Sequence, residues 1–209
     1  MDNRLSDKKT RTKSMILKCA REAFLINGYN RTDIGNIARD AGINKRTIYR
    51  YFVNKEALAF VIWKQVLEEI LDISIDHEGK SGYHKLESLL YEYISRVKKN
   101  QEVIRFLGEF DHVFSGEYPN IDEAEQFVSF IRNSDNVMLS YIKEGMKDKS
   151  IIEDIDPLLV SSTLSNLLMS LSQRVVIRGE HLKIEQGYSF ELLDEGVRLL
   201  LLGIKGSTV

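Results

Sequence analysis

Apolar residues recur at intervals of three and four along almost the whole chain of 209 residues, and no stretch of any length alternates strictly between apolar and polar. The first pattern is typical of amphipathic helices, whereas strict alternation would indicate strands. We therefore predict an all-α protein of about nine helices. Their expected spans are residues 12–26, 33–41, 45–52, 55–73, 83–99, 102–114, 122–147, 157–179 and 189–202.

Two short helices between residues 32 and 55 stand apart from the others. A side-chain oxygen of Thr32 or Asp33 can cap the first, and Gly42 can end it because glycine tolerates positive φ. Asn44 can cap the second helix, residues 45–52, whose outer side carries hydrogen-bond donors: Lys45, Arg46, Thr47, Tyr49 and Arg50. Two short helices across a three-residue turn, the second rich in donors, are typical of a helix-turn-helix.

Charge is distributed unevenly along the chain. Residues 1–55 contain 13 Lys or Arg and 5 Asp or Glu, a net charge of +8, whereas residues 56–209 carry −10, for a total of −2. A basic head on an acidic body is expected when only the head meets DNA phosphates. Residues 1–12 are polar without periodicity, and we expect most of this arm to be disordered. Four basic residues are suited either to the DNA backbone or minor groove or to a flexible tail: Lys8, Lys9, Arg11 and Lys13.

The helix-turn-helix segment and its flanks resemble the TetR family of one-component transcriptional regulators. The resemblance covers about a quarter of the chain and rests on Ile16, Ala20, Phe24, Gly28-Tyr29, Thr32, Ile37-Ala38, Ala41-Gly42-Ile43, Thr47-Ile48-Tyr49-Arg50-Tyr51-Phe52 and Asn54-Lys55-Glu56-Ala57-Leu58. It implies a DNA-binding domain in residues 1–55, with a recognition helix at 45–52, and an effector-binding and dimerisation domain in residues 56–209. It further implies a homodimer that binds a palindromic double-stranded DNA operator as a repressor, which an unidentified small-molecule effector releases.

A different class of function stays open beside this resemblance. The chain could be a helical interaction protein, or a constitutive DNA-binding protein without effector control. Binding to duplex DNA separates the first alternative from a regulator, and a response to small molecules separates the second.

The residues expected to bind DNA follow partly from chemistry and partly from the resemblance. Lys45 and Arg46 open the recognition helix, where either can bond O6 and N7 of guanine. Position 46 is often small in the family, so Arg46 implies a different base recognition. The resemblance places base or phosphate contacts on the middle of this helix and phosphate contacts at the start of the next helix. The full predicted set is Thr32, Asn44, Lys45, Arg46, Thr47, Tyr49, Arg50, Tyr51 and Lys55.

The resemblance also implies a pocket for a small effector in the body, which aromatic side chains would suit. Many aromatic residues of the body fall on helical stripes, where they serve equally well as core. Glu109 flanks one such stripe and is suited either to a cationic ligand or to an exposed helix flank. The predicted pocket residues are Trp63, Phe106, Glu109, Phe110, Phe130, Asn166, Met169 and Gln173.

Two apolar helices near the end of the chain are candidates for a dimer interface. Helix 157–179 carries leucines on one side and polar residues with Met169 on the other, and the sequence leaves open which side meets a partner and which a pocket. By resemblance, this helix and the last one form a four-helix interface with their two-fold copies. The predicted interface residues are Leu164, Leu168, Leu171, Leu193, Val197, Leu200 and Ile204. The alternative is that both stripes are buried within one chain.

Other chemistry is sparse in the sequence. Cys19 is the single cysteine, so neither a disulfide framework nor a zinc finger is expected. The four histidines are scattered, and no glycine-rich phosphate loop occurs, so we predict neither an enzyme nor a cofactor or metal. No apolar run is long enough for a signal peptide or a membrane span, which predicts a cytoplasmic protein without a membrane partner.

Overall fold

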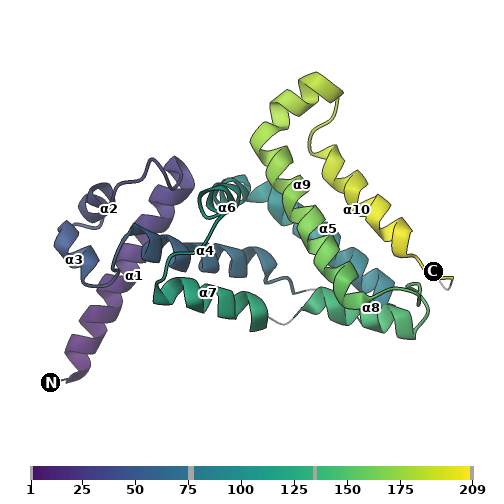
Figure 1. Ribbon diagram of the computed structural model, residues 1–209, viewed down its shortest axis with the longest axis horizontal. Helices are drawn as coiled ribbons and strands as arrows, with labels where there is room; N and C mark the ends of the chain where they lie inside the picture. The colour runs from purple at the N-terminus through teal and green to yellow at the C-terminus, as the bar shows by residue number, and fades with distance from the viewer. Residues whose placement is uncertain (1, 75–77, 134–135, 208–209) are drawn as a thin grey trace. The chain divides into compact units, whose positions relative to one another are not determined.

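A computed structural model describes residues 2–74, 78–133 and 136–207 (Figure 1). These residues form ten helices and no strand, which confirms the all-α fold: α1 (Asp2–Asn27), α2 (Ile34–Asp40), α3 (Lys45–Tyr49), α4 (Lys55–Leu71), α5 (Gly82–Lys99), α6 (Gln101–Val113), α7 (Asp122–Asn133), α8 (Val137–Lys147), α9 (Pro157–Gln186) and α10 (Glu191–Ile204). A single antiparallel bridge between Ile151 and Lys205 ties the loop before α9 to the end of α10.

Several helix boundaries differ from the sequence-based prediction. The recognition helix expected over residues 45–52 ends at Tyr49. The helix expected over residues 122–147 is two helices, because the Asn136 side chain accepts a hydrogen bond from Leu139 N at 2.9 Å and starts α8 anew. The helix from Pro157 does not end at Gly179 but continues to Gln186. It stops at Gly187, whose φ of 82° is left-handed and readily adopted only by glycine.

The expectation of a disordered arm over residues 1–12 is wrong for the residues described, since α1 begins at Asp2; residue 1 lies outside them. Within this stretch Thr12 Oγ1 donates to Lys8 O at 2.9 Å. The segment lacks an apolar stripe but also lacks the glycine or proline that would break a helix. Missing periodicity thus corresponds to the lack of a buried side chain among residues 7–12, and it did not indicate an unfolded segment.

The helices form two compact units. The first contains α1, α2, α3, α4 up to Glu69, α6 from Arg105, and α7; the second contains the rest of α4 and α6 together with α5, α8, α9 and α10. The functional boundary predicted at residue 55 falls inside the first unit, because α6 and α7 pack with the helix-turn-helix. The described residues include no helix long and apolar enough to cross a membrane.

The core of the first unit contains a cluster of aromatic side chains. Rings from α1, α4, α6 and α7 meet in stacked, edge-to-face and tilted arrangements, at centroid distances of 3.9 to 6.5 Å. These geometries are the favourable ones for aromatic pairs. The main contributors are Phe24, Tyr29, Phe60, Trp63, Phe106, Phe110, Phe114 and Phe127.

The second unit is held together by leucines and by one close helix crossing. α5 packs against α8 where a Cβ at Gly82 would collide with the backbone of Gly145. Five residues of the predicted dimer stripe are buried here in the single chain, so that assignment is corrected: Leu164, Leu168, Leu193, Val197 and Ile204. Leu171 and Leu200 are half-buried. These side chains hold α9 and α10 onto their own unit.

Candidate nucleic-acid interface

Two helix caps and one glycine with positive φ fix the turn between α2 and α3. Asp33, rather than Thr32, caps α2 by accepting a hydrogen bond from Gly35 N at 2.6 Å. Gly42 has a φ of 64°, which lets Ile43 N return to Ala38 O at 2.9 Å and close the helix end. Asn44 Oδ1 accepts from Thr47 N at 2.9 Å and starts α3. The two helices are thereby held in a fixed relation to each other.

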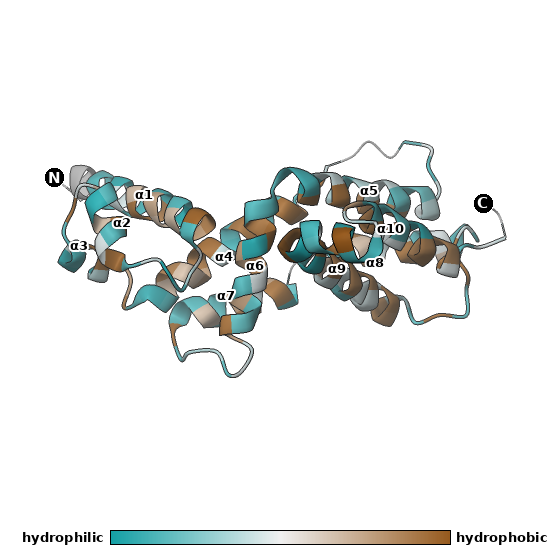
Figure 2. Ribbon diagram, turned by 90° about the horizontal axis from the view of Figure 1, so that it is seen from above, coloured by the Kyte–Doolittle hydropathy of each residue, from teal (hydrophilic) through white to brown (hydrophobic). Residues whose placement is uncertain are grey.

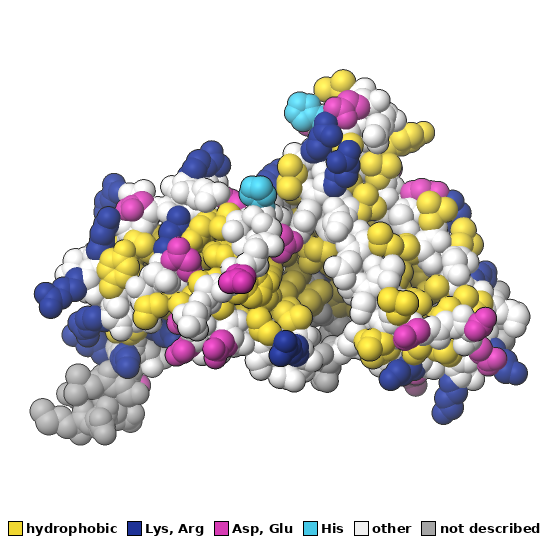
Figure 3. Space-filling view, in the orientation of Figure 1, with side chains coloured by type: hydrophobic (Ala, Val, Ile, Leu, Met, Phe, Trp, Pro, Cys, Tyr) yellow, Lys and Arg dark blue, Asp and Glu magenta, His cyan; other side chains and the backbone are white. Residues whose placement is uncertain are grey.

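The outer side of α3 is exposed and rich in donors. Ile48 is fully buried, whereas the ring of Tyr49 is 50% exposed. The other exposed side chains on this surface are Asn44, Lys45, Arg46 and Arg50, and Thr47 and Tyr51 are half-buried. Figure 3 shows Lys and Arg side chains gathered over the end of the first unit that contains α2, α3 and the start of α1. The sequence-predicted recognition residues thus lie together on one surface.

Two of these residues already have partners in the protein. Lys45 Nζ lies 3.2 Å from Asp33 Oδ1, and both side chains are more than half exposed. An ion pair this exposed contributes about 0–1 kcal/mol, so Lys45 can leave it for a base or phosphate at low cost. Hydrogen bonds from Lys45 and from Gly35 N keep the pKa of the Asp33 carboxyl below its usual value, the Gly35 bond having the larger effect. Thr47 Oγ1 bonds Asn44 Oδ1 at 3.1 Å, which couples its hydroxyl to the cap.

The prediction of a DNA contact by Thr32 is corrected by its surroundings. The residue is 4% exposed, and its Oγ1 lies 2.7 Å from Gly28 O and 3.1 Å from Ala23 O. Its N–H donates to Tyr29 O at 3.2 Å. Both donors of Thr32 are therefore used to close the end of α1, and the residue supports the interface from within.

Lys55 begins α4 and lies against the turn that follows α1. Its Nζ sits 4.1 Å from the centroid of the Tyr29 ring, a cation–π contact. Burial lowers the pKa of the Lys55 amine, while the carboxylates of Glu56 and Glu109 act in the opposite direction. The half-buried ammonium is available at the start of α4, where the helix dipole also favours an anion.

Glu109 has a role that the sequence did not indicate. Its two carboxylate oxygens accept hydrogen bonds from Tyr29 N at 2.8 Å and Asn30 N at 3.0 Å. The glycine before them, Gly28, leaves room for this approach, since a Cβ there would collide with the carboxylate. Glu109 thus fastens α6 to the turn leading into α2. A side chain eighty residues away in sequence gives no local signal for such a contact, and a contact between Glu109 and an effector stays a prediction.

The predicted aromatic pocket residues of the first unit are packed against one another. Trp63 is 7% exposed and stacks on Phe110 at 3.9 Å between centroids. Phe106 is 6.4 Å from Phe110, and Phe130 reaches this cluster through Phe127. The Trp63 indole N–H is buried and has no hydrogen-bond partner among the residues that the structure describes. A buried donor without an acceptor raises the free energy of the folded state, and an acceptor that bonds to it would remove this penalty.

The remaining predicted pocket residues lie on α9 in the second unit. Asn166 is exposed and donates from Nδ2 to Ser162 O at 2.8 Å. Met169 Sδ accepts a hydrogen bond from the Tyr93 hydroxyl at 3.7 Å. Gln173, four residues after Met169, is half-buried. Burial raises the pKa of Tyr93, so its hydroxyl keeps its proton and remains a donor.

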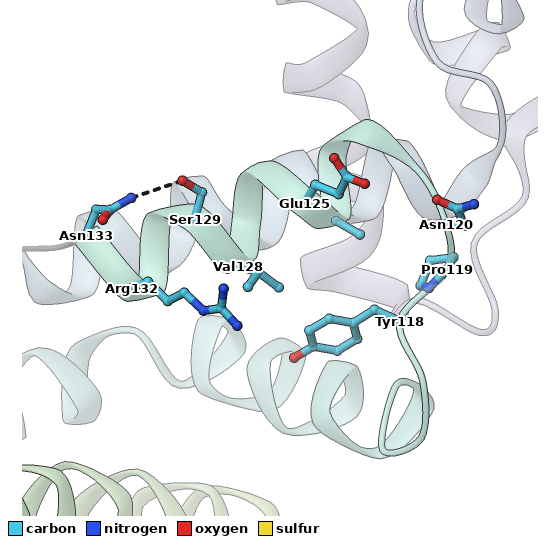
Figure 4. Close-up of a pocket in the computed structure, with 9 residues that line it drawn as sticks. Tyr118, Pro119, Asn120, Glu125, Val128, Ser129, Arg132 and Asn133 are labelled. Atoms are coloured by element: carbon cyan, nitrogen blue, oxygen red, sulfur yellow. Dashed lines mark hydrogen bonds between the residues drawn. The ribbon is translucent and has the colours of Figure 1, made fainter.

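The surface of the first unit also has an open pocket of about 650 Å³ along α7 and the loop before it (Figure 4). The Arg132 guanidinium and the Tyr118 ring extend toward this hollow, with Val128 between them. None of the predicted effector residues lines it. In the described parts of the chain, His, Cys, Asp and Glu side chains form no group of three that could hold a metal ion.

The sequence of this chain is similar to those of known bacterial regulatory proteins. Residues 16–62 match the family described as bacterial regulatory proteins, tetR family. The HTH-type transcriptional regulator UidR of Escherichia coli (strain K12) is 25% identical over 210 residues, which cover 98% of this chain and 97% of that protein. The fatty acid metabolism regulator protein of Bacillus subtilis (strain 168) is 35% identical over 152 residues, 71% of this chain and 76% of that protein.

A solved structure shows that the fold extends beyond the helix-turn-helix. The transcriptional regulator FadR from Bacillus subtilis, in complex with stearoyl-CoA, superposes with a TM-score of 0.58 at 20% identity. The match covers 92% of this chain and 99% of that chain. The similarity therefore includes the helices of both units.

Proposed function

Because this chain belongs to the TetR family of bacterial regulatory proteins, we propose that it is a homodimeric repressor that binds a palindromic operator and leaves it when a small molecule binds. The observation that carries the proposal is the exposed, donor-rich side of α3 on a buried helix-turn-helix core. A recognition helix of this kind reads base edges in the major groove. In a dimer, two such helices require half-sites about one helical turn apart.

The DNA part of the proposal is tested on a duplex that the wild-type protein selects from a random library. Replacing Lys45 and Tyr49 together with alanine should weaken binding to this duplex, with a loss of roughly 1–3 kcal/mol for each residue, measured by fluorescence anisotropy. The matched control is Lys143→Ala with Tyr188→Ala, an exposed pair of the same composition in the second unit. Equal affinities for the two double variants would remove α3 as the recognition helix.

For the effector we propose an acyl thioester of coenzyme A. The relative that is 35% identical is a fatty acid metabolism regulator, and the FadR structure contains stearoyl-CoA. In this chain the aromatic cluster offers apolar surface, and the unpaired Trp63 N–H offers a donor for a carbonyl oxygen. Stearoyl-CoA should quench or shift the fluorescence of Trp63, the only tryptophan, and should release the selected duplex.

The competing function is constitutive DNA binding. The close packing of Trp63 against Phe110 and Phe127 favours this function, because the rings fill the space that a ligand would need. The ring centroids of both pairs are 3.9 Å apart. By linkage, an effector must bind the DNA-free form more tightly, typically by about 1–3 kcal/mol. A ligand that binds the chain yet leaves operator affinity unchanged supports constitutive binding, and coupled release supports the regulated repressor.

A further inference from the structure

The first turns of α1 carry an unusual arrangement of charge. Between Asp7 and Glu22 the sequence has six Lys or Arg and no Asp or Glu. Among the side chains of α1 that the structure describes, those of residues 7–15 are exposed or half-buried and Ile16 is the first buried one, so this part of the helix packs against little of the unit. Figure 2 shows the start of α1 as predominantly hydrophilic. Such a helical segment gains little from the protein core.

The apolar stripe of α1 changes to lysine where the core ends. Ile16 and Ala20, both fully buried, lie on the side that packs on the helix-turn-helix. Three and seven residues before Ile16, the same stripe carries Lys13 and Lys9. Both lysines are exposed, and as an i, i+4 pair of like charge they repel each other.

A contact fixes the direction in which this stripe faces. Lys13 Nζ lies 5.7 Å from the centroid of the ring of Phe52, which stands three residues after the end of α3 at Tyr49. Since an α-helix rises about 1.5 Å per residue, Lys9 stands about 6 Å farther along the axis on the same side. The two lysines therefore belong to the basic end of the first unit that also carries α3 (Figure 3).

We propose that Lys9 and Lys13 form a second phosphate-binding surface, in which α1 contacts the backbone of the duplex beside the base pairs that α3 reads. The inference rests on the proposed binding of duplex DNA by α3. The contact is made by one side of a formed helix and to phosphates, so it adds affinity without base specificity. The negative charge of the phosphates would also reduce the electrostatic repulsion between the two lysine ammonium groups.

The chain provides a matched control on the same helix. Arg11 and Lys18 are exposed and basic, and they lie about 200° around the helix from Lys9 and Ile16 respectively. The variants Lys9→Gln/Lys13→Gln and Arg11→Gln/Lys18→Gln lose the same charge and keep residues of good helix propensity. Lys9→Arg/Lys13→Arg retains the charge on the proposed side. Circular dichroism of all three checks that α1 is equally helical.

The measurement is the affinity for the selected duplex against salt concentration. Removing one lysine–phosphate pair should lower the slope of log K against log salt by about 0.9. We expect Lys9→Gln/Lys13→Gln to lower the slope by about 2 per subunit, with roughly tenfold or greater weakening near 0.1 M salt, and the arginine variant to bind as the wild type does. Equal slopes for the two glutamine variants would overturn this inference. The proposed function would still stand if the variant with alanine at Lys45 and Tyr49 binds the duplex weakly. If the wild type selects no duplex, the proposed function fails first.

Discussion

At the scale of single residues, the interface depends on side chains that do not touch the outer surface. Glu109 supplies a carboxylate to two backbone N–H groups in the turn after α1, and the Tyr29 hydroxyl donates to Glu56 Oε1 at 3.3 Å. Tyr29 also packs on Phe114 of the α6 end. The turn that leads into α2 is thus held by α4 and α6 together, so a change in either helix reaches the helix-turn-helix through a few named bonds.

Glu109→Gln should lower both stability and operator affinity. An amide has one oxygen, so one of the two N–H groups at Tyr29 and Asn30 would face an NH₂ donor instead of an acceptor. A loss of about 1–2 kcal/mol is expected in urea unfolding, together with weaker binding of the selected duplex. Glu102→Gln, an exposed glutamate on the same helix, should leave both quantities unchanged.

Variants of Thr32 can show whether this residue stabilises the helix-turn-helix from within or contacts DNA. Thr32→Val keeps the shape and removes the hydroxyl that serves Gly28 O and Ala23 O, so it should cost about 1–2 kcal/mol in unfolding. Thr32→Ser keeps the hydroxyl and should retain most of this stability. At a temperature where both variants are folded, their operator affinities should match that of the wild type. A large drop in affinity in folded Thr32→Val would restore the DNA contact that the resemblance implied.

At the scale of helices, the sequence predicted faces better than ends. The apolar stripes correctly indicated the helices that pack in a core, because a side that must be buried follows the 3.6-residue repeat, whereas the start of α1, which has no apolar stripe, was missed. Ends depend on single caps: Gly179 could have stopped α9, yet it is accommodated in the helix and Gly187 stops it. Asn136, which caps α8, was a signal present in the sequence. The bonds of Glu109 and the orientation of Lys13 depend on tertiary packing, which no local pattern encodes.

The crossing of α5 and α8 should be sensitive to one methyl group. Gly82→Ala would place a Cβ against the backbone of Gly145 and the Tyr141 carbonyl, where no flexible side chain can move aside. Overpacking of this kind typically costs about 1–3 kcal/mol, measurable as a lower midpoint in thermal or urea unfolding. Gly116→Ala, where a Cβ would meet only open space, should be neutral or slightly stabilising. Equal stability of the two variants would show that the helices separate easily.

At the scale of the whole molecule, the unsatisfied apolar surface of the second unit lies on α9 and α10. The most leucine-rich stripes, which the sequence suggested for a dimer interface, are buried in the core of this unit instead. Six exposed apolar residues of the two helices lie on the other side, each about half exposed or more: Leu159, Leu167, Ile177, Ile184, Leu199 and Leu202. Burying such a surface against a two-fold copy would gain about 25 cal/mol for each Å² of apolar area.

Two glutamates introduced on this exposed apolar surface of α9 and α10 should therefore separate the subunits without unfolding them. Leu167 and Leu199 are 48% and 55% exposed in the single chain, so Leu167→Glu with Leu199→Glu leaves the core intact but puts four carboxylates into a two-fold interface. We expect the wild type to sediment as a dimer at micromolar concentration and this variant as a folded monomer, with weaker operator binding because one subunit reaches only one half-site.

The control for this prediction is Leu158→Glu, a leucine with 57% exposure on the same helix. Nine residues separate it from Leu167, which is about half a turn around the helix axis, so it lies on the opposite side of α9. This variant should remain a dimer and bind DNA normally. Dissociation by both variants would mean that any added charge on α9 unsettles the assembly. A wild type that is monomeric yet binds the palindrome with full affinity would contradict the dimer itself.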